Sequence, residues 1–105
     1  MSEHLTMATW HVKPGEEKAF VEDWTRFAEW AATMPGATTL HLGRDIEDPS
    51  KYVSFGTWAD LASVHGWKSR PGFGERRDNV LRHVEGFAPL ELEVVSTAAA
   101  AAALA

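Results

Sequence analysis

Two tryptophans and a histidine that lie close together in the chain are the residues best suited to chemistry. Trp58 ends the segment 52–58, whose alternation is typical of a strand, and His65 and Trp67 follow at helical spacing. Indole rings stack on flat aromatic ligands, and a neutral imidazole can accept a proton or bind haem iron near pH 7. These residues therefore predict an aromatic-walled binding site at a strand-to-helix corner. Core packing is the alternative role of the tryptophans, and a surface position is the alternative for His65.

Four polar side chains elsewhere are further candidates for this site. His11 and Thr9 share one face of a predicted strand at 5–13, and His11 would be a second proton acceptor. Arg76 or Arg77 could hold a phenolate or a carboxylate at the mouth of a pocket. A solvated helix face is the alternative role of these arginines.

Ser54 and Phe73 complete the set of candidate binding residues. Ser54 lies on the same face of its predicted strand as Trp58, and a bend at 70–74 lets Phe73 pack. No nucleophile-elbow motif surrounds Ser54, so nucleophilic catalysis is not expected. The chain has no cysteine, and its five histidines follow no metal-binding spacing, so we expect no metal site.

Composition and charge limit the number of domains and the kinds of partner. A chain of 105 residues fits one domain, which we place at 1–97, followed by an alanine-rich tail at 98–105. The net charge of −5 would repel a phosphate backbone, so nucleic acid is not expected as a partner. No stretch has the pattern of a signal peptide or the length of a membrane span. We expect a cytoplasmic protein with no membrane partner.

Alternating and helical patterns predict the order of the elements. Strands are expected at 5–13, 37–45, 52–58 and 90–96. The first helix carries an apolar stripe at intervals of three and four and ends at a Pro-Gly pair; the stripe consists of Phe20, Trp24, Phe27, Ala31 and Met34. Helical spacing resumes at Leu61, and a second helical piece is expected at 75–84.

This order predicts a ferredoxin-like α+β domain of βαββαβ topology with an antiparallel sheet. Helices would cover one face of the sheet. Several strands carry apolar residues on both faces, and apolar surface left in water costs about 25 cal/mol per Å². We therefore expect a homodimer whose two sheets pack face to face over more than about 1,000 Å².

Five motifs between Met7 and Val95 resemble those of a known family. They are VKPGEEKAF after the first strand, MPGATTLHL at the end of the first helix, the hairpin RDIEDPSKYVSFGTW, WKSRPGF, and the closing strand LELEVV. On these motifs the chain is similar to the antibiotic biosynthesis monooxygenase-like group of dimeric α+β barrel proteins. That resemblance implies a barrel formed by two subunits. The family includes cofactor-free oxygenases that act on anthrones and quinols, as well as haem-degrading enzymes.

The resemblance transfers to individual positions only in part. Trp58 matches a tryptophan that ends the third strand and lines the pocket in both oxygenase branches. In haem-degrading members an asparagine on the first strand matches Thr9, and the iron-binding histidine matches Trp67, two residues after His65. Quinol-oxidising members have an asparagine where this chain has Ser54. The resemblance therefore implies the fold more fully than the reaction.

The leading hypothesis is a cofactor-independent monooxygenase that oxidises a polycyclic phenol, anthrone or quinol with O2. The indole rings of Trp58 and Trp67 would form a slot for the substrate. His65 or His11 would accept the proton. Ser54, Thr9 or an arginine would stabilise the resulting anion. One alternative is a haem-binding or haem-degrading enzyme with His65 as the iron ligand. Another is a non-catalytic dimeric protein that binds a small ligand. The sequence does not identify the substrate.

Overall fold

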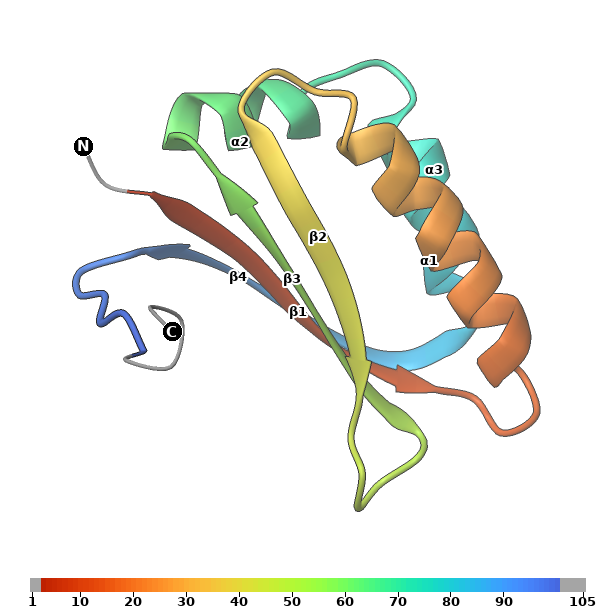
Figure 1. Cartoon of the computed structure of the whole chain (residues 1–105). Helices are drawn as coiled ribbons and strands as arrows, with labels where there is room; N and C mark the ends of the chain where they lie inside the picture. Colours follow the sequence, from red (N-terminus) through yellow and green to blue (C-terminus); the bar gives the residue numbers. More distant parts are fainter. Residues whose placement is uncertain (1–2, 101–105) are drawn as a thin grey trace.

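The fold is one four-stranded antiparallel sheet with helices against one of its faces (Figure 1). The computed structural model describes residues 3–100, so part of the predicted tail lies outside the described residues. The elements follow in the order β1 (His4–Val12), α1 (Glu17–Ala31), β2 (Ala37–Arg44), β3 (Lys51–Trp58), α2 (Leu61–Lys68), α3 (Phe73–Leu81) and β4 (Val84–Glu93). This order confirms the predicted ferredoxin-like α+β fold.

The strand order β2-β3-β1-β4 places β1 and β3 at the centre of the sheet. All neighbouring strands are antiparallel, and Ala8 of β1 lies opposite Ser54 of β3. Because side chains alternate between the two faces of a strand, this register puts one set of residues from both strands under the helices. Trp10 and Trp58 belong to that set and are 3% and 0% exposed.

Helix α1 covers this face with the apolar stripe that the sequence predicts. All five stripe residues, from Phe20 to Met34, are buried. The helix follows a turn at Gly15, which has φ +85° and whose N–H donates to the Glu17 carboxylate at 2.9 Å. After α1 the chain turns at Gly36, where φ is +86° and the Ser63 side chain leaves no room for a Cβ.

The last part of the chain differs from the expected pattern. α3 begins at Phe73 rather than Glu75, and β4 begins at Val84, six residues before the expected strand at Leu90. Pro89 lies inside β4, although proline cannot donate a ladder hydrogen bond. β4 is an edge strand, however, where a missing N–H on the outer side is tolerated.

The second face of the sheet carries no helix within residues 3–100 (Figure 1). Apolar side chains on it remain in contact with solvent; Leu90 is 57% and Phe55 41% exposed. Among the described helices, none has the length and apolar character required to cross a membrane.

Candidate functional site

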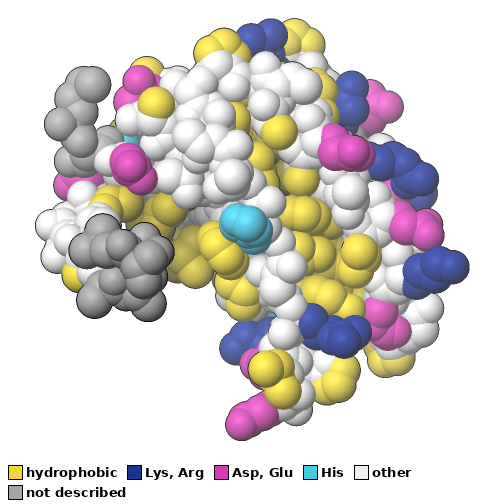
Figure 2. Space-filling view, viewed as in Figure 1, with side chains coloured by type: hydrophobic (Ala, Val, Ile, Leu, Met, Phe, Trp, Pro, Cys, Tyr) yellow, Lys and Arg dark blue, Asp and Glu magenta, His cyan; other side chains and the backbone are white. Residues whose placement is uncertain are grey.

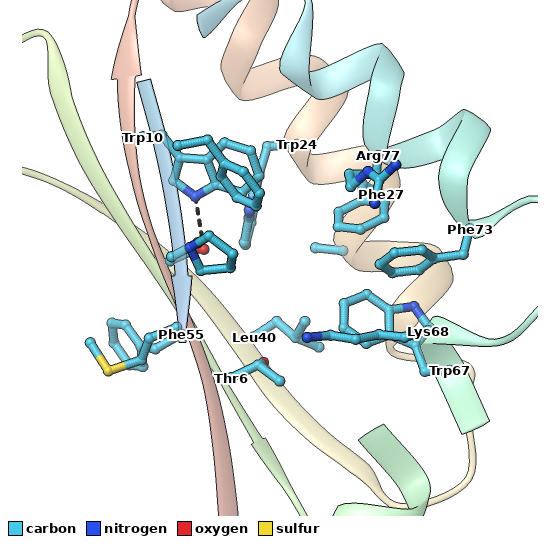
Figure 3. Close-up of a pocket in the computed structure, with 16 residues that line it drawn as sticks. Thr6, Trp10, Trp24, Phe27, Leu40, Phe55, Trp67, Lys68, Phe73 and Arg77 are labelled. Carbon is cyan, nitrogen blue, oxygen red and sulfur yellow. Dashed lines mark hydrogen bonds between the residues drawn. The ribbon is translucent and has the colours of Figure 1, made fainter. Parts of the chain in front are cut away.

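A cavity of about 170 Å³ lies between the helix-covered face of the sheet and the helices (Figure 3). The strands provide its floor, chiefly through Thr6, Ala8, Trp10, Leu40, Ser54, Phe87 and Pro89. The three helices provide its roof, through Trp24, Phe27, Ala28, Trp67, Lys68, Phe73 and Arg77. Most of these side chains are apolar or aromatic, which is the usual lining of a small-molecule site.

The surface view shows where apolar side chains gather around this layer. Hydrophobic side chains line a hollow between β2 and α1 (Figure 2). In the same view further hydrophobic side chains appear on the other side of β2, on the sheet face that carries no helix. The interior between sheet and helices is therefore not fully closed to solvent at the edge formed by β2.

Two hydroxyl groups on the floor accept hydrogen bonds from tryptophans. Trp10 Nε1 donates to Ser54 Oγ at 2.9 Å, as the dashed line in Figure 3 shows. Trp58 Nε1 donates to Thr6 Oγ1 at 3.1 Å. Indole is a donor only, so the direction of both hydrogen bonds is fixed.

The roof is a cluster of aromatic rings centred on Trp67. This indole stacks on Trp58, with ring centroids 5.0 Å apart and an interplanar angle of 25°. Phe73 meets it edge-on at 5.0 Å, and Phe27 packs at 5.5 Å. Trp67 therefore separates the cavity from Trp58, which is fully buried behind it.

Two cationic side chains border the otherwise apolar cavity. Lys68 Nζ donates to Glu91 Oε1 at 2.8 Å, and His65 Nε2 lies 3.4 Å from the other oxygen of Glu91. The hydrogen bond from Lys68 is the main reason that the pKa of Glu91 lies below its ordinary value. Arg77 lies over the Phe73 ring, with Cζ 5.7 Å from the ring centroid.

Two buried N–H donors beside the cavity have no hydrogen-bond partner among the described residues. They are Trp67 Nε1 and Arg77 Nε. A buried donor without an acceptor costs roughly 1–3 kcal/mol, and native structures contain few of them. Both donors belong to residues that line the cavity, so an acceptor on a ligand is one way to satisfy them.

The structure brings four of the predicted site residues together. Ser54, Trp67, Phe73 and Arg77 all line the cavity. Their assignment to substrate binding stays a prediction, but their arrangement around one cavity agrees with the expected aromatic wall at the end of β3.

The other predicted site residues lie elsewhere. Thr9 and His11 sit at the positions of β1 that face away from the helices, so the expectation that His11 points into the cavity is corrected. Trp58 is behind Trp67, as described above. His65 is 59% exposed on the outer side of α2 and pairs with Glu91. Arg76 lies over Trp30, with Cζ 4.7 Å from the ring centroid.

Sequence reasoning missed Thr6, Trp10 and Lys68 as cavity residues. The alternation of β1 already grouped Thr6 and Trp10 on one face, but Thr9 and His11 directed attention to the other face. The signal was the greater apolar character of the Trp10 face, since helices cover the more apolar side of a sheet.

A second cluster of titratable groups lies away from the cavity, near the start of α1. His83 Nδ1 is 3.0 Å from Glu16 Oε1, and His83 Nε2 is 2.6 Å from Asp23 Oδ2. Burial disfavours the charged imidazole, yet the hydrogen bonds to Asp23 and Glu16 outweigh burial and raise the pKa of His83 above 6.5. The hydrogen bond with His83 lowers the pKa of Asp23 below 3.8.

This cluster is an ion-pair network rather than a metal centre. Arg82 Nη2 also donates to Asp23 Oδ2, at 3.1 Å. Within residues 3–100 no group of three or more ligating side chains is placed to hold a metal ion. Both nitrogens of His83 are occupied by carboxylates, so the cluster ties the connection between α3 and β4 to the start of α1.

Comparison with protein families and with solved structures agrees with the fold. The family model for antibiotic biosynthesis monooxygenase matches residues 4–79. No curated protein sequence matches the chain. A point mutant of SnoaB, a cofactor-independent oxygenase from Streptomyces nogalater, superposes with a TM-score of 0.86 at 20% identity, over 92% of this chain and 97% of that one.

Two further structures give the same result. Another SnoaB structure has a TM-score of 0.78 at 19% identity, covering 94% of this chain and 97% of that one. A candidate antibiotic biosynthesis monooxygenase from Nitrosomonas europaea has a TM-score of 0.78 at 18% identity, covering 89% and 90%. At these identities the likeness establishes the fold alone.

Proposed function

Because this chain belongs to the antibiotic biosynthesis monooxygenase family, we propose that it is a cofactor-independent monooxygenase that oxidises a phenol, anthrone or quinol with dioxygen. The observation that carries the proposal is the cavity between sheet and helices. Its walls are largely aromatic, and its charged lining residues are the two cations Lys68 and Arg77. Such a site suits a flat aromatic molecule that becomes an anion during the reaction.

The substrate itself supplies the electrons in this reaction. Loss of a proton gives a delocalised anion, which passes one electron to O2. In the case of anthrone the ring CH2 becomes a carbonyl group: two hydrogens leave the carbon, one oxygen atom enters the carbonyl, and the other leaves as water. The protein must hold the ring, stabilise the anion and exclude bulk water.

The cavity contains groups suited to stabilising the anion. The ammonium group of Lys68, the guanidinium of Arg77 and the hydroxyl of Ser54 can each approach an oxygen of the ligand. The described lining includes no imidazole or carboxylate, so the proposal assigns no protein base. Stabilisation of the anion lowers the pKa of the substrate, and the proton passes to water at the cavity mouth.

The cavity size favours a compact ligand. Its volume of 170 Å³ is close to the roughly 150 Å³ of an engineered cavity that binds benzene. Drug-sized pockets have about 300–1,000 Å³. One or two rings therefore fit inside, and a third ring would extend into the open mouth.

The haem hypothesis does not fit the residues present. His65 lies outside the cavity and is engaged by Glu91. The position of the family's iron ligand holds Trp67, whose ring is fixed by three aromatic neighbours. A cavity of 170 Å³ is also small for a macrocycle.

Oxygen uptake tests the proposed function. Anthrone and 1,4-dihydroxynaphthalene are incubated with the protein in an oxygen electrode, and the expected result is consumption above the uncatalysed rate. Two neighbouring arginines provide a matched pair of variants: Arg77→Met should lower the rate about tenfold because it removes a cation at the cavity, whereas Arg76→Met should not. Binding of these compounds without oxygen uptake would instead indicate a non-catalytic ligand-binding protein.

We also propose that two subunits pair through the open face of the sheet. Leu90 is 57% exposed there, and burying such side chains is worth about 25 cal/mol per Å². Analytical ultracentrifugation should give a dimer for the wild type and a monomer for Leu90→Glu. Val21→Glu is the control, because Val21 is an exposed apolar residue of α1 and not of the sheet. A monomeric wild type at micromolar concentration would refute the pairing.

A further inference from the structure

The two hydrogen bonds from tryptophan to a hydroxyl group both cross between the central strands β1 and β3. In each pair an indole N–H on one central strand donates to a hydroxyl on the other, from Trp10 to Ser54 and from Trp58 to Thr6. The donors are almost fully buried, so no water competes for the hydroxyl from the indole side. The hydroxyls of Thr6 and Ser54 line the cavity, whereas Trp58 does not.

In each pair the proton of the Thr6 or Ser54 hydroxyl takes no part in the hydrogen bond from the indole. A hydroxyl has one donor and two acceptor lone pairs, and the indole occupies a lone pair. Within the described residues, these are the hydrogen bonds that the Thr6 and Ser54 hydroxyl groups make, and in both the hydroxyl is the acceptor. The two hydroxyl protons are therefore free to donate to a molecule in the cavity.

The register of the sheet sets the spacing of these two donors. Thr6 lies opposite Gly56 and Ala8 opposite Ser54, so Thr6 and Ser54 are diagonal neighbours on one face. Diagonal neighbours are roughly 7–8 Å apart along the backbone, a spacing that suits two ligand oxygen atoms better than one. Gly56, opposite Thr6, keeps the space beside the Thr6 hydroxyl open, since a Cβ there would lie 3.1 Å from both Thr6 Oγ1 and Leu40 Cγ.

We propose that Thr6 and Ser54 bind two separate oxygen substituents of the aromatic ligand. Trp58 and Trp10 are then positioning residues, because their N–H groups fix the direction of the hydroxyl protons. The inference rests on the proposed function for the aromatic nature of the ligand. It adds the residues that recognise the ligand's oxygen atoms, and it gives Trp58 a role without contact to the cavity.

Anaerobic binding measurements separate this inference from the reaction. The probes are naphthalene, 1-naphthol and 1,4-dihydroxynaphthalene, and binding is followed by quenching of tryptophan fluorescence. Ser54→Ala and Thr6→Val should each weaken 1,4-dihydroxynaphthalene about fivefold, the usual value of one neutral hydrogen bond, and leave naphthalene unchanged. Thr6→Ser keeps the hydroxyl and should bind like the wild type, which controls for effects on folding.

A double-mutant cycle tests the positioning role. Trp58→Phe removes the N–H of a residue outside the cavity lining and should weaken 1,4-dihydroxynaphthalene about threefold, with naphthalene unaffected. In the Thr6→Val background the same change should have no further effect on binding. Additive losses would show that Trp58 has only a structural role.

The outcomes keep the two proposals apart. Equal losses for naphthalene and 1,4-dihydroxynaphthalene, or no loss in any hydroxyl variant, would overturn the two-donor site even if oxygen uptake is normal. Failure of the wild type to bind any of the three probes would also overturn it. The expected binding pattern without oxygen uptake would leave the two-donor site intact and remove only the monooxygenase function.

Discussion

Buried polar groups occur at two places between α1 and the sheet, and they are satisfied to different degrees. Near the start of α1, both ring nitrogens of His83 are paired with carboxylates, and one of these carboxylates also accepts from Arg82. At the cavity, Ser54 accepts a hydrogen bond without donating one to any described residue, and Trp67 Nε1 has no partner.

The paired groups near His83 and the unpaired donors at the cavity should therefore contribute to different properties, the first to folding stability and the second to ligand binding. A fully paired cluster contributes to folding and offers nothing to a ligand. Unused donors lower stability by roughly 1–3 kcal/mol each, and a ligand that supplies acceptors recovers that free energy. We therefore expect changes near His83 to affect unfolding alone, and changes near Ser54 to affect mainly binding.

The largest effect is expected for His83→Ala. The substitution removes the hydrogen bonds of His83 to Asp23 and Glu16 and leaves a void at a buried side chain, so it should lower the free energy of unfolding by about 2–3 kcal/mol in urea titrations. Binding of 1,4-dihydroxynaphthalene to the folded protein should not change. His65→Ala is the control, since the His65 side chain on α2 is 59% exposed and lies away from the proposed dimer face, so its loss should stay within about 1 kcal/mol. Equal urea midpoints for the two variants would contradict the distinction.

The same cluster predicts a dependence of stability on pH. The pKa of His83 is raised, so its contribution is complete below the unfolded value of 6.5 and is lost as pH rises through the folded pKa. The pKa of Asp23 is lowered, so its contribution is present above 3.8 and is lost as pH falls through the folded pKa. The cluster is therefore most stabilising between these two values.

Urea titrations at two pH values measure this dependence. The wild type should have a higher midpoint at about pH 5.5 than at about pH 8.5, and His83→Gln should show a smaller difference. If the wild-type midpoint falls between about pH 5.5 and about pH 8.5 by no more than the midpoint of His83→Gln, His83 is not stabilised as an imidazolium.

The sequence predicted the sheet and its helical cover because each depends on local patterns. The alternation of β3 and the apolar stripe from Phe20 to Met34 are confirmed, since residues that alternate or recur at helical spacing have few ways to be buried. The start of β4 was missed because its edge position, which makes Pro89 acceptable, depends on the order of strands in space.

The cavity was harder to predict than the fold. Trp58 and Trp67 were expected to form a slot together, but they stack on each other, and only Trp67 reaches the cavity. His83 showed no metal spacing in the sequence, and its partners are 60 and 67 residues away. Such contacts are set by tertiary packing, which local patterns do not contain.

A matched pair of tryptophan substitutions sharpens the comparison. Trp10→Phe and Trp67→Phe each remove one buried indole N–H, which is paired in Trp10 and unpaired in Trp67. We expect Trp10→Phe to be the more destabilising by at least about 1 kcal/mol in urea titrations, because it loses the net value of one hydrogen bond whereas Trp67→Phe removes an unpaired donor. A larger loss for Trp67→Phe would mean that its N–H makes a stabilising contact and is not an unused donor.

The smallest effect on stability is expected for Glu91→Gln at the edge of the cavity. Lys68 and Glu91 have side chains that are 32% and 35% exposed, so their ion pair should contribute less than about 1 kcal/mol to unfolding. The substitution leaves the charge of Lys68 without its neutralising partner. Affinity for 2-naphthoate should therefore rise about two- to threefold at low salt, and the gain should shrink at about 0.5 M salt because exposed charges are screened.

Two control measurements isolate the contribution of the Lys68 charge to ligand binding. Naphthalene carries no charge and should bind equally to the wild type and to Glu91→Gln. Glu93→Gln changes the net charge by the same amount on the same strand without touching Lys68, so it should leave 2-naphthoate binding nearly unchanged. If Glu93→Gln raises the affinity as much as Glu91→Gln does, the gain comes from overall charge, and Lys68 does not act on ligands in the cavity.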